Sequence, residues 1–126
     1  MEDILNEVKA LIAAGYKEVV LTGINIGDFD GAENPPKRLA DLVRAVDAVE
    51  GLERLRISSI DPDEVDDDLM DAIFSGKNTC HSLHLVLQAG SNVVLKRMNR
   101  KYTRQIFYET VRRLLDRDPD FTLTTD

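Results

Sequence analysis

Apolar residues recur along the chain with two different periods, and the two periods predict helices and strands in turn. Residues 2–14 place apolar side chains on one face of a 3.6-residue helix, and Gly15 follows where a C′ glycine belongs. Comparable spacing predicts further helices at 37–50, 66–75, 92–98 and 103–117. Short β-branched or alternating segments predict strands at 17–23, 54–60, 82–88 and 121–125. The first of these strands is apolar at consecutive positions, so it is predicted to be buried on both faces.

The order of these elements predicts the fold class. One helix is followed by three strand–helix units and a last strand, which is typical of an α/β fold with parallel strands alternating with helices. If helices cover the outside of the sheet, the residues that face them are Leu55, Ile57, Leu83, Leu85, Leu87, Phe121 and Leu123. The opposite face then carries Arg56, Ser58, His84, Gln88, Thr122, Thr124 and Asp126.

That second face is too polar for the dry interior of a closed barrel. It indicates a wider or open barrel that holds a polar ligand. The alternative is that these side chains only hydrogen-bond one another or lie on the exposed face of a smaller sheet. His84 alone is more typical of a structural histidine, and Gly23 alone is explained by a turn.

Small and polar residues also follow the predicted strands directly. In parallel α/β folds ligands bind at the carboxyl ends of the strands, where this chain has 22–25, 58–59, 88–91 and Asp126. The loop from Asn25 to Pro36 is long for an ordinary connection, and loops of that length are often functional. The sequence therefore predicts a binding site at this end of the sheet.

Composition restricts the class of protein. The 126 residues include 16 Lys and Arg against 23 Asp and Glu, a net charge of −7, with 43% hydrophobic residues, which suits one globular domain. No apolar run approaches the roughly 20 residues that cross a bilayer, and no secretory signal follows Met1. We expect no membrane association and a cytoplasmic location. The acidic segment 61–68 is interpreted as a solvated loop and helix start rather than a metal site.

One basic segment interrupts this acidity. Its cations surround Tyr102 and are Lys96, Arg97, Arg100, Lys101 and Arg104. A basic turn with an aromatic residue can contact phosphates or a partner protein, although an exposed helix end is the commoner explanation. A single cysteine, Cys80, excludes an internal disulfide and any multi-cysteine metal site made by this chain alone, so no metal ligands are predicted.

Several stretches resemble the central part of the radical S-adenosylmethionine domain of the methylthiotransferases. They are EVVLTGINIGDF at 18–29, GLERLRISSIDP at 51–62, HSLHLVLQAGSNVVLKRMNRKYT at 81–103 and TTD at 124–126. Together they cover nearly the whole chain in the family's order. The RISSI and MNRKYT stretches are most similar to the branch that modifies N6-threonylcarbamoyladenosine in tRNA. The branches acting on isopentenyladenosine or on a ribosomal protein stay open.

The resemblance implies a fold, a cofactor and a reaction. The fold is an open (β/α)6 partial TIM barrel, with S-adenosylmethionine and a 4Fe-4S cluster at the strand ends. Reductive cleavage of S-adenosylmethionine gives a radical that abstracts hydrogen from C2 of the adenine, and a methylthio group is added there. The cofactor-binding residues it implies are Gly23, Asn25, Ser58, Ser59 and Gln88; it assigns no catalytic residue.

The chain also departs from that family. The CxxxCxxC cluster motif is absent, as are the flanking N-terminal domain and the C-terminal RNA-binding domain, and Val86 and Ala89 replace the usual proline and serine. We therefore expect residues 1–126 to be a partial radical domain that is inactive alone, holds no cofactor and leaves tRNA binding to other domains. Its exposed sheet edges are expected either to form a dimer or to be covered by the N-terminal helix. The alternatives are a noncatalytic α/β interaction or scaffold domain and a flavodoxin-like domain, although no GxGxxG or P-loop signature follows a strand.

Overall fold

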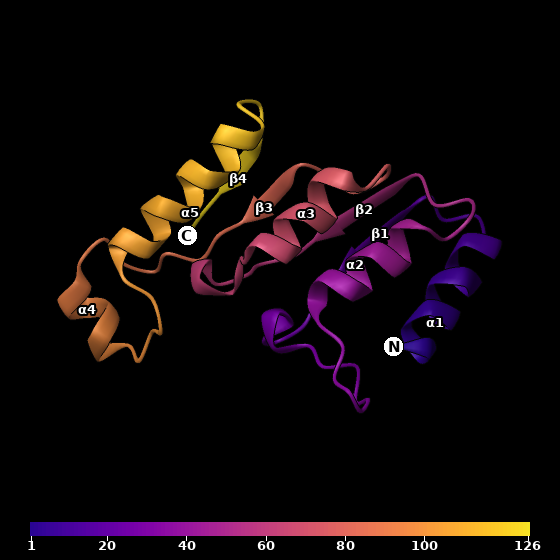
Figure 1. The fold of residues 1–126 in the computed structure, drawn as a ribbon, viewed down its shortest axis with the longest axis horizontal. Helices are drawn as coiled ribbons and strands as arrows, with labels where there is room; N and C mark the ends of the chain where they lie inside the picture. The colour runs from indigo at the N-terminus through magenta and orange to yellow at the C-terminus, as the bar shows by residue number, and fades with distance from the viewer.

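Helices cover one side of a row of short parallel strands in the computed structural model, which describes residues 1–126 (Figure 1). The α-helices are α1 (Glu2–Ala13), α2 (Leu39–Asp47), α3 (Asp67–Ser75), α4 (Asn92–Arg97) and α5 (Arg104–Arg117). The strands are β1 (Glu18–Leu21), β2 (Arg54–Ile57), β3 (Ser82–His84) and β4 (Thr122–Thr124). Two short 3-10 helices, η1 (Ile26–Asp28) and η2 (Pro62–Glu64), follow β1 and β2. The predicted α/β class, with parallel strands alternating with helices, is confirmed, and it is consistent with part of a (β/α) barrel.

The four strands lie in chain order but form two pairs. β1 pairs with β2 in parallel, with Val19 opposite Leu55, and β3 pairs with β4 in parallel, with Leu83 opposite Leu123. Isolated parallel bridges join Leu55 to Thr79 and Ile60 to Leu85, so they connect the segment around β2 to the segment around β3. All strand carboxyl ends therefore lie at the same end of the row.

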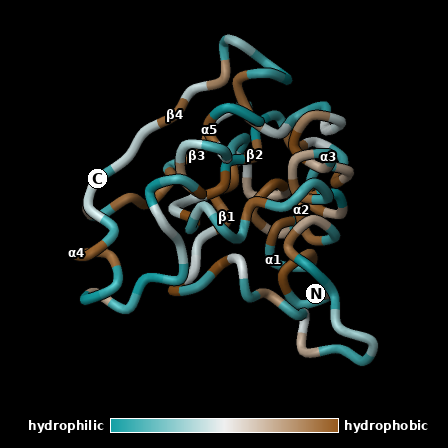
Figure 2. Tube along the Cα trace, turned by 60° about the vertical axis from the view of Figure 1, so that its left-hand side comes forward, coloured by the Kyte–Doolittle hydropathy of each residue, from teal (hydrophilic) through white to brown (hydrophobic).

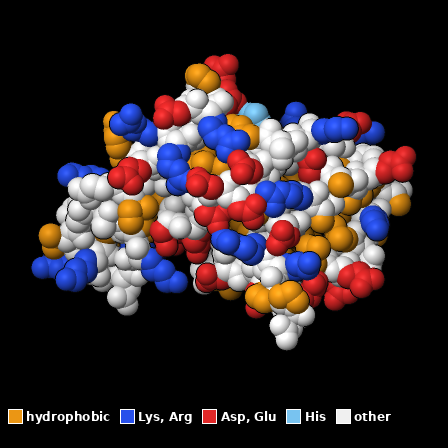
Figure 3. Space-filling view, viewed as in Figure 1, with side chains coloured by type: hydrophobic (Ala, Val, Ile, Leu, Met, Phe, Trp, Pro, Cys, Tyr) orange, Lys and Arg blue, Asp and Glu red, His pale blue; other side chains and the backbone are white.

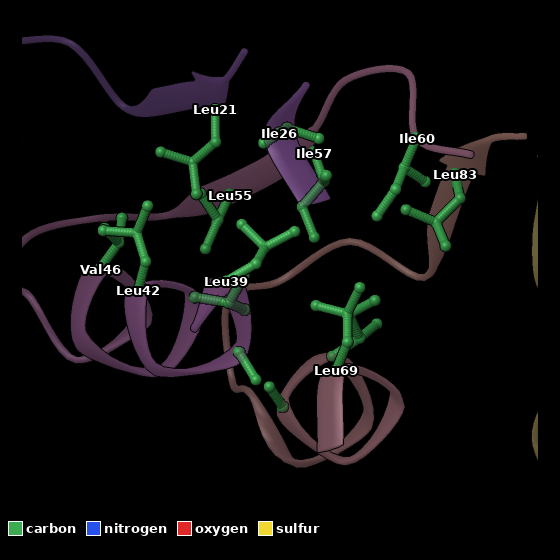
Figure 4. Packing of buried hydrophobic residues seen from close by; sticks show 14 of the residues in the cluster. Leu21, Ile26, Leu39, Leu42, Val46, Leu55, Ile57, Ile60, Leu69 and Leu83 are labelled. Atoms are coloured by element: carbon green, nitrogen blue, oxygen red, sulfur yellow. The ribbon is translucent and has the colours of Figure 1, made fainter. Parts of the chain in front are cut away.

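The core lies between the strands and the helices. Leu21, Leu55, Ile57, Ile60 and Leu83 extend from the strands and their continuations toward Leu39, Leu42, Val46 and Leu69 on α2 and α3 (Figure 4). Figure 2 shows α1, α2 and α3 grouped to one side of the strands. Local contacts fix the helix starts: the Asp66 carboxylate accepts a hydrogen bond from the Leu69 N–H at 2.8 Å, and Thr103 Oγ1 accepts one from the Ile106 N–H at 3.3 Å.

The prediction that the first strand is buried on both faces is wrong. Val19 and Leu21 are buried, but Val20 between them is 52% exposed. The reason is that the helices cover one face only. The opposite face, with Val20 and Arg56, has no covering layer and is the polar face that the alternation predicted.

The predicted alternation fails at the end of the third strand. Leu83 and Leu85 face the core, but Val86 is buried as well and Leu87 is only half-buried. Gln88 has a φ of 64°, in the left-handed region, so the backbone turns out of the strand there. The two-residue period therefore ends before Gln88.

The first helix is less buried than its apolar stripe predicts. Of that stripe only Val8 is buried, and Leu11 is 37% exposed. An apolar groove of about 640 Å³ lies along α1, β1 and the η1 loop, which leaves this side of α1 accessible. Its lining also includes the acidic residues Asp3, Glu7, Asp28 and Asp30, and it reaches Gly23 and Asn25 at the end of β1. None of the helices combines the length and apolar character needed to span a bilayer.

Candidate functional site

A polar hollow of about 260 Å³ lies at the carboxyl ends of the strands. We call it the strand-end hollow. Its lining comes from five separate segments: Gly23, Ile24, Asn25 and Ile26 after β1; Ser59, Ile60, Asp61 and Glu64 after β2; Val86 and Gln88 after β3; Arg100 before α5; and Asp126 after β4. The structure thus brings together four of the five predicted site residues, namely Gly23, Asn25, Ser59 and Gln88.

The segment after β1 is positioned by a buried anchor. Ile26 is buried in the core and begins η1, so the preceding turn of Thr22 to Asn25 is held at the rim. Around Gly23 there is free space, because a Cβ placed there would have only the Ile26 backbone within 4 Å. A ligand can therefore approach the Gly23 backbone closely.

The fifth predicted residue, Ser58, lies outside the lining of the hollow. Its N–H donates to the Leu21 carbonyl at 2.9 Å, so Ser58 continues the pairing of β2 with β1. Ile57 and Ile60 are both buried, although they are three residues apart, which breaks the two-residue alternation between them. As a consequence Ser59, rather than Ser58, lines the hollow.

The far side of the hollow is held by contacts between the segments after β3 and β4. Gln88 Nε2 donates to Asp126 Oδ2 at 3.1 Å, and the Gln88 N–H donates to the Asp126 carbonyl at 3.2 Å. His84 Nδ1 lies 2.8 Å from Thr124 Oγ1, and its Nε2 lies 3.8 Å from Asp126 Oδ1. His84 therefore has polar partners on the polar face, as expected of a structural histidine.

Three charged residues of the hollow were not predicted as site residues. They are Asp61, Glu64 and Arg100. Burial and the neighbouring Asp63 raise the pKa of Asp61, and burial together with Asp61 and Asp28 raises the pKa of Glu64. Asp61 could have been predicted from its position directly after the second predicted strand. For Arg100 the sequence indicated only that it belongs to the basic segment.

Arg100 is notable because part of its guanidinium has no partner. Its Nε is buried and makes no hydrogen bond, although Asp61, Glu64 and Asp126 line the same hollow. A buried N–H donor without an acceptor is unfavourable. Arg100 is therefore a partly unpaired cation among the residues that line the hollow.

The acidic segment 61–68 divides into two parts. Asp66 caps α3 and pairs with Arg38, while Asp67 pairs with Arg113 and Asp68 pairs with Arg44 at 2.6 Å, which agrees with a solvated helix start. Asp61 and Glu64, in contrast, face the hollow. Glu64 packs directly against Gly27, where any added side chain would collide with its carboxylate.

The metal-binding capacity of the chain is limited. No group of three or more His, Cys, Asp or Glu side chains is arranged to hold a metal ion. Cys80 is half-buried, and its N–H donates to the Leu55 carbonyl at 2.8 Å beside the sheet. An iron–sulfur cluster takes several cysteine thiolates, so the residues present do not fit such a cluster.

Comparison with known proteins adds to this geometry. The sequence profile of the Radical SAM superfamily matches residues 1–125. The "Threonylcarbamoyladenosine tRNA methylthiotransferase MtaB" of Chlamydia pneumoniae is 50% identical over 125 residues, which are 99% of this chain and 29% of that protein.

Two further relatives are named for a different tRNA modification. The "tRNA-2-methylthio-N(6)-dimethylallyladenosine synthase" of Desulforamulus reducens is 42% identical over 99% of this chain and 27% of its own length. The protein of the same description from Clostridium perfringens is 38% identical over 99% of this chain and 28% of its own length. The chain therefore spans less than a third of the length of each of these relatives.

Proposed function

The chain belongs to the Radical SAM superfamily, and from that premise we propose that it is part of the radical domain of a tRNA methylthiotransferase in which the strand-end hollow binds the amino-acid end of S-adenosylmethionine. The observation that supports this most is the charge inside the hollow. Three carboxylates, from Asp61, Glu64 and Asp126, line the hollow together with Arg100, whose Nε lacks a partner. S-adenosylmethionine carries a sulfonium, an ammonium and one carboxylate. Its net positive charge suits the acidic lining, and its carboxylate suits Arg100.

Each remaining residue of the hollow has a role in this proposal. The Asn25 and Gln88 amides and the Ser59 hydroxyl supply neutral donors and acceptors for the ribose and the amino acid. Gly23 lets its backbone approach the ligand because no side chain intervenes. Ser58 does not line the hollow, so in this proposal it supports the site only through its pairing with Leu21.

When bound beside a reduced 4Fe-4S cluster, S-adenosylmethionine supplies radical chemistry. The chain does not carry the ligands of that cluster. In the proposal, the residues described here bind and orient the cofactor, while the cluster and the tRNA-binding domains belong to the rest of the parent enzyme. This chain alone is therefore inactive, and the parent acts in the cytoplasm, where its tRNA substrate is found.

We place the substrate in the threonylcarbamoyladenosine branch, with the methylthio group added at C2. The support is the relative named for threonylcarbamoyladenosine, which is 50% identical to this chain, whereas the two relatives named for dimethylallyladenosine are 42% and 38% identical. The alternative of a noncatalytic scaffold domain is favoured by the lack of cluster ligands, but it does not account for the polar donors and acidic groups that line the hollow.

Binding by the 126-residue chain tests the proposal. In ¹⁵N-HSQC titrations, S-adenosylmethionine is expected to shift the amides of Gly23, Asn25 and Gln88 and the Arg100 Nε–H resonance. 5′-Methylthioadenosine lacks the amino-acid carboxylate, so it should leave the Arg100 signal in place.

Matched variants complete the test. Arg100→Gln should weaken S-adenosylmethionine binding about tenfold, the effect of losing one charge-assisted hydrogen bond of about 1.4 kcal/mol, and should leave 5′-methylthioadenosine binding unchanged. Arg112→Gln, at an exposed position on α5, is the control. Shifts confined to residues outside the hollow, or equal losses for both ligands, would overturn the assignment.

A further inference from the structure

The charge of this acidic chain is unevenly distributed around α4. Residues 89–108 contain five Lys and Arg and no Asp or Glu, although the whole chain has 16 Lys and Arg against 23 Asp and Glu. Figure 3 shows the blue side chains gathered over α4 at the left, whereas over α2 and α3 blue and red side chains alternate. We define the α4 basic surface as the exposed cations of this segment, which are Lys96, Arg97, Lys101 and Arg104.

Ion pairing separates these cations from most other arginines of the chain, Arg112 being the exception. Six arginines outside the segment have a carboxylate within 4.0 Å: Arg38, Arg44, Arg54, Arg56, Arg113 and Arg117. None of the four side chains of the α4 basic surface has such a partner. Their charge is therefore available to an external anion.

The α4 basic surface is held in place by its own anchors. Leu95 on α4 and Tyr102 after it are buried, at 1% and 2% exposure, and the Tyr102 hydroxyl donates to the Leu87 carbonyl at 3.3 Å. Asn92 Nδ2 donates to Gln105 Oε1 at 2.9 Å, and the Arg104 N–H donates to Asn92 Oδ1 at 2.8 Å, which ties α4 to the start of α5. The cations are thus presented on a fixed frame, which reduces the entropy lost on binding.

The position of this surface relates it to the strand-end hollow. Arg100 lies between Arg97 and Lys101 in the chain and lines the hollow, while its neighbours are exposed. A ligand that covers α4 therefore lies next to the opening where the cofactor is proposed to bind. This arrangement suits a polyanionic substrate whose phosphates lie on the α4 basic surface while its reacting group lies near the hollow.

We infer that the α4 basic surface binds the phosphate backbone of the RNA substrate and holds the target nucleotide beside the hollow. The inference rests on the proposed function, and it adds that this domain contacts tRNA itself rather than leaving RNA binding to other domains. RNA is repelled by the rest of an acidic chain, so binding at one basic surface also sets its orientation. The exposed side chains of Val93 and Val94 on α4, and of Met98 directly after it, offer apolar contact to an unstacked base.

Two triple variants with the same net charge test the inference. The first, Lys96→Gln/Arg97→Gln/Lys101→Gln, neutralises the surface. The second, Lys9→Gln/Lys77→Gln/Arg112→Gln, removes two lysines and one arginine at exposed positions elsewhere that have no carboxylate within 4.0 Å. Fluorescence anisotropy with a labelled tRNA anticodon stem–loop, at a series of salt concentrations, measures binding to the chain, and circular dichroism verifies that both variants fold.

The expected result is a loss specific to the first variant. Its affinity for the stem–loop should fall roughly tenfold or more at low salt, and the slope of log K against log salt should become shallower by about 2, because three phosphate contacts are lost. The control should bind like the original chain. Equal losses in both variants, no loss in either, or no binding by the original chain would each overturn the inference.

A separate titration distinguishes this failure from failure of the proposed function. S-adenosylmethionine binding is measured on the same three proteins by the HSQC method described above. Retained cofactor binding with no effect of the first variant on RNA rejects the inference and leaves the proposed function standing. Loss of cofactor binding in the original chain rejects the proposed function and removes the premise of the inference.

Discussion

Gln88 and Asp126 are joined by two hydrogen bonds at the strand-end hollow, one from the Gln88 side chain at 3.1 Å and one from its N–H at 3.2 Å. Gln88 reaches this position through a left-handed φ of 64°. Its side chain is nevertheless exposed, so the hydrogen bond to Asp126 is accessible to solvent. The pair therefore places an amide at the rim of the hollow without contributing to the core.

Gln88→Ala should change the stability of the chain little, by roughly 1 kcal/mol or less, because an exposed hydrogen bond exchanges readily with water. Leu85→Ala, at a fully buried position, should cost about 2–5 kcal/mol through lost burial and a cavity. Urea unfolding measures both. In the parent enzyme Gln88→Ala should weaken S-adenosylmethionine binding. A destabilisation equal to that of Leu85→Ala, with unchanged cofactor affinity, would make Gln88 a structural residue.

Asp47 should stabilise the fold at neutral pH and lose this effect in acid. Burial alone would raise its pKa, but hydrogen bonds from the Asn78 N–H at 2.8 Å, the Thr79 hydroxyl at 2.8 Å and the Lys77 N–H at 3.0 Å hold the pKa below its ordinary value. A carboxyl with a lowered pKa contributes stability above its ordinary pKa and loses it as the pH falls through the lowered pKa. Asp47→Ala should therefore cost about 1–3 kcal/mol at pH 7.

Unfolding at a series of pH values tests the role of Asp47. The destabilisation by Asp47→Ala should shrink below the ordinary carboxyl range, since the original chain loses its ionic acceptor there. Asp3→Ala, at an exposed position on α1, provides the comparison. A penalty for Asp47→Ala that is independent of pH would show that the charge of Asp47 is not involved.

Glu64→Gln should stabilise the chain at neutral pH. Burial, Asp61 and Asp28 raise the pKa of Glu64, and its ionised carboxylate costs stability once the pH rises through that raised pKa. The amide has no charge, so the gain should appear at neutral pH and disappear below the ordinary pKa of a glutamate. Thermal melts at pH 7 and pH 3 measure it. An equal gain at both pH values would exclude an electrostatic cause.

The chain alone should hold no iron–sulfur cluster after anaerobic reconstitution. Cys80 is its single cysteine and lies half-buried, and one thiolate cannot replace the several that a cluster takes. Iron and sulfide analysis of the gel-filtered protein, with Cys80→Ser as the control, measures retention. Stoichiometric cluster in a monomer that is lost in Cys80→Ser would contradict the expectation.

The outer edges of β1 and β4 should be covered in solution. Exposed edges favour pairing with another chain, and the apolar groove beside β1 adds accessible hydrophobic area. We expect a dimer through these edges, or coverage of the β1 edge by α1. Light scattering gives the mass, and hydrogen exchange reports on the edge amides. A monomeric mass combined with freely exchanging amides along β1 would rule out both arrangements.

Much of the fold was determined by local sequence. The 3.6-residue apolar spacing located all five α-helices, and the left-handed Gly15 closes α1 as predicted. Alternation placed Leu55, Leu83 and Leu85 in the core correctly. These features depend on residues that are close together in the sequence, so the local spacing of apolar residues predicts them.

Tertiary structure decided which side chains meet at the strand ends. It buried both Ile57 and Ile60, which moved Ser58 out of the hollow and Ser59 into it, and it turned Gln88 out of strand geometry to meet Asp126. It left Val20 exposed because helices cover only one face, and it placed Arg100 in the hollow with Asp61 and Glu64. Such contacts join residues that are distant in the chain. Their positions depend on how separate strands end and pack, which no local period encodes.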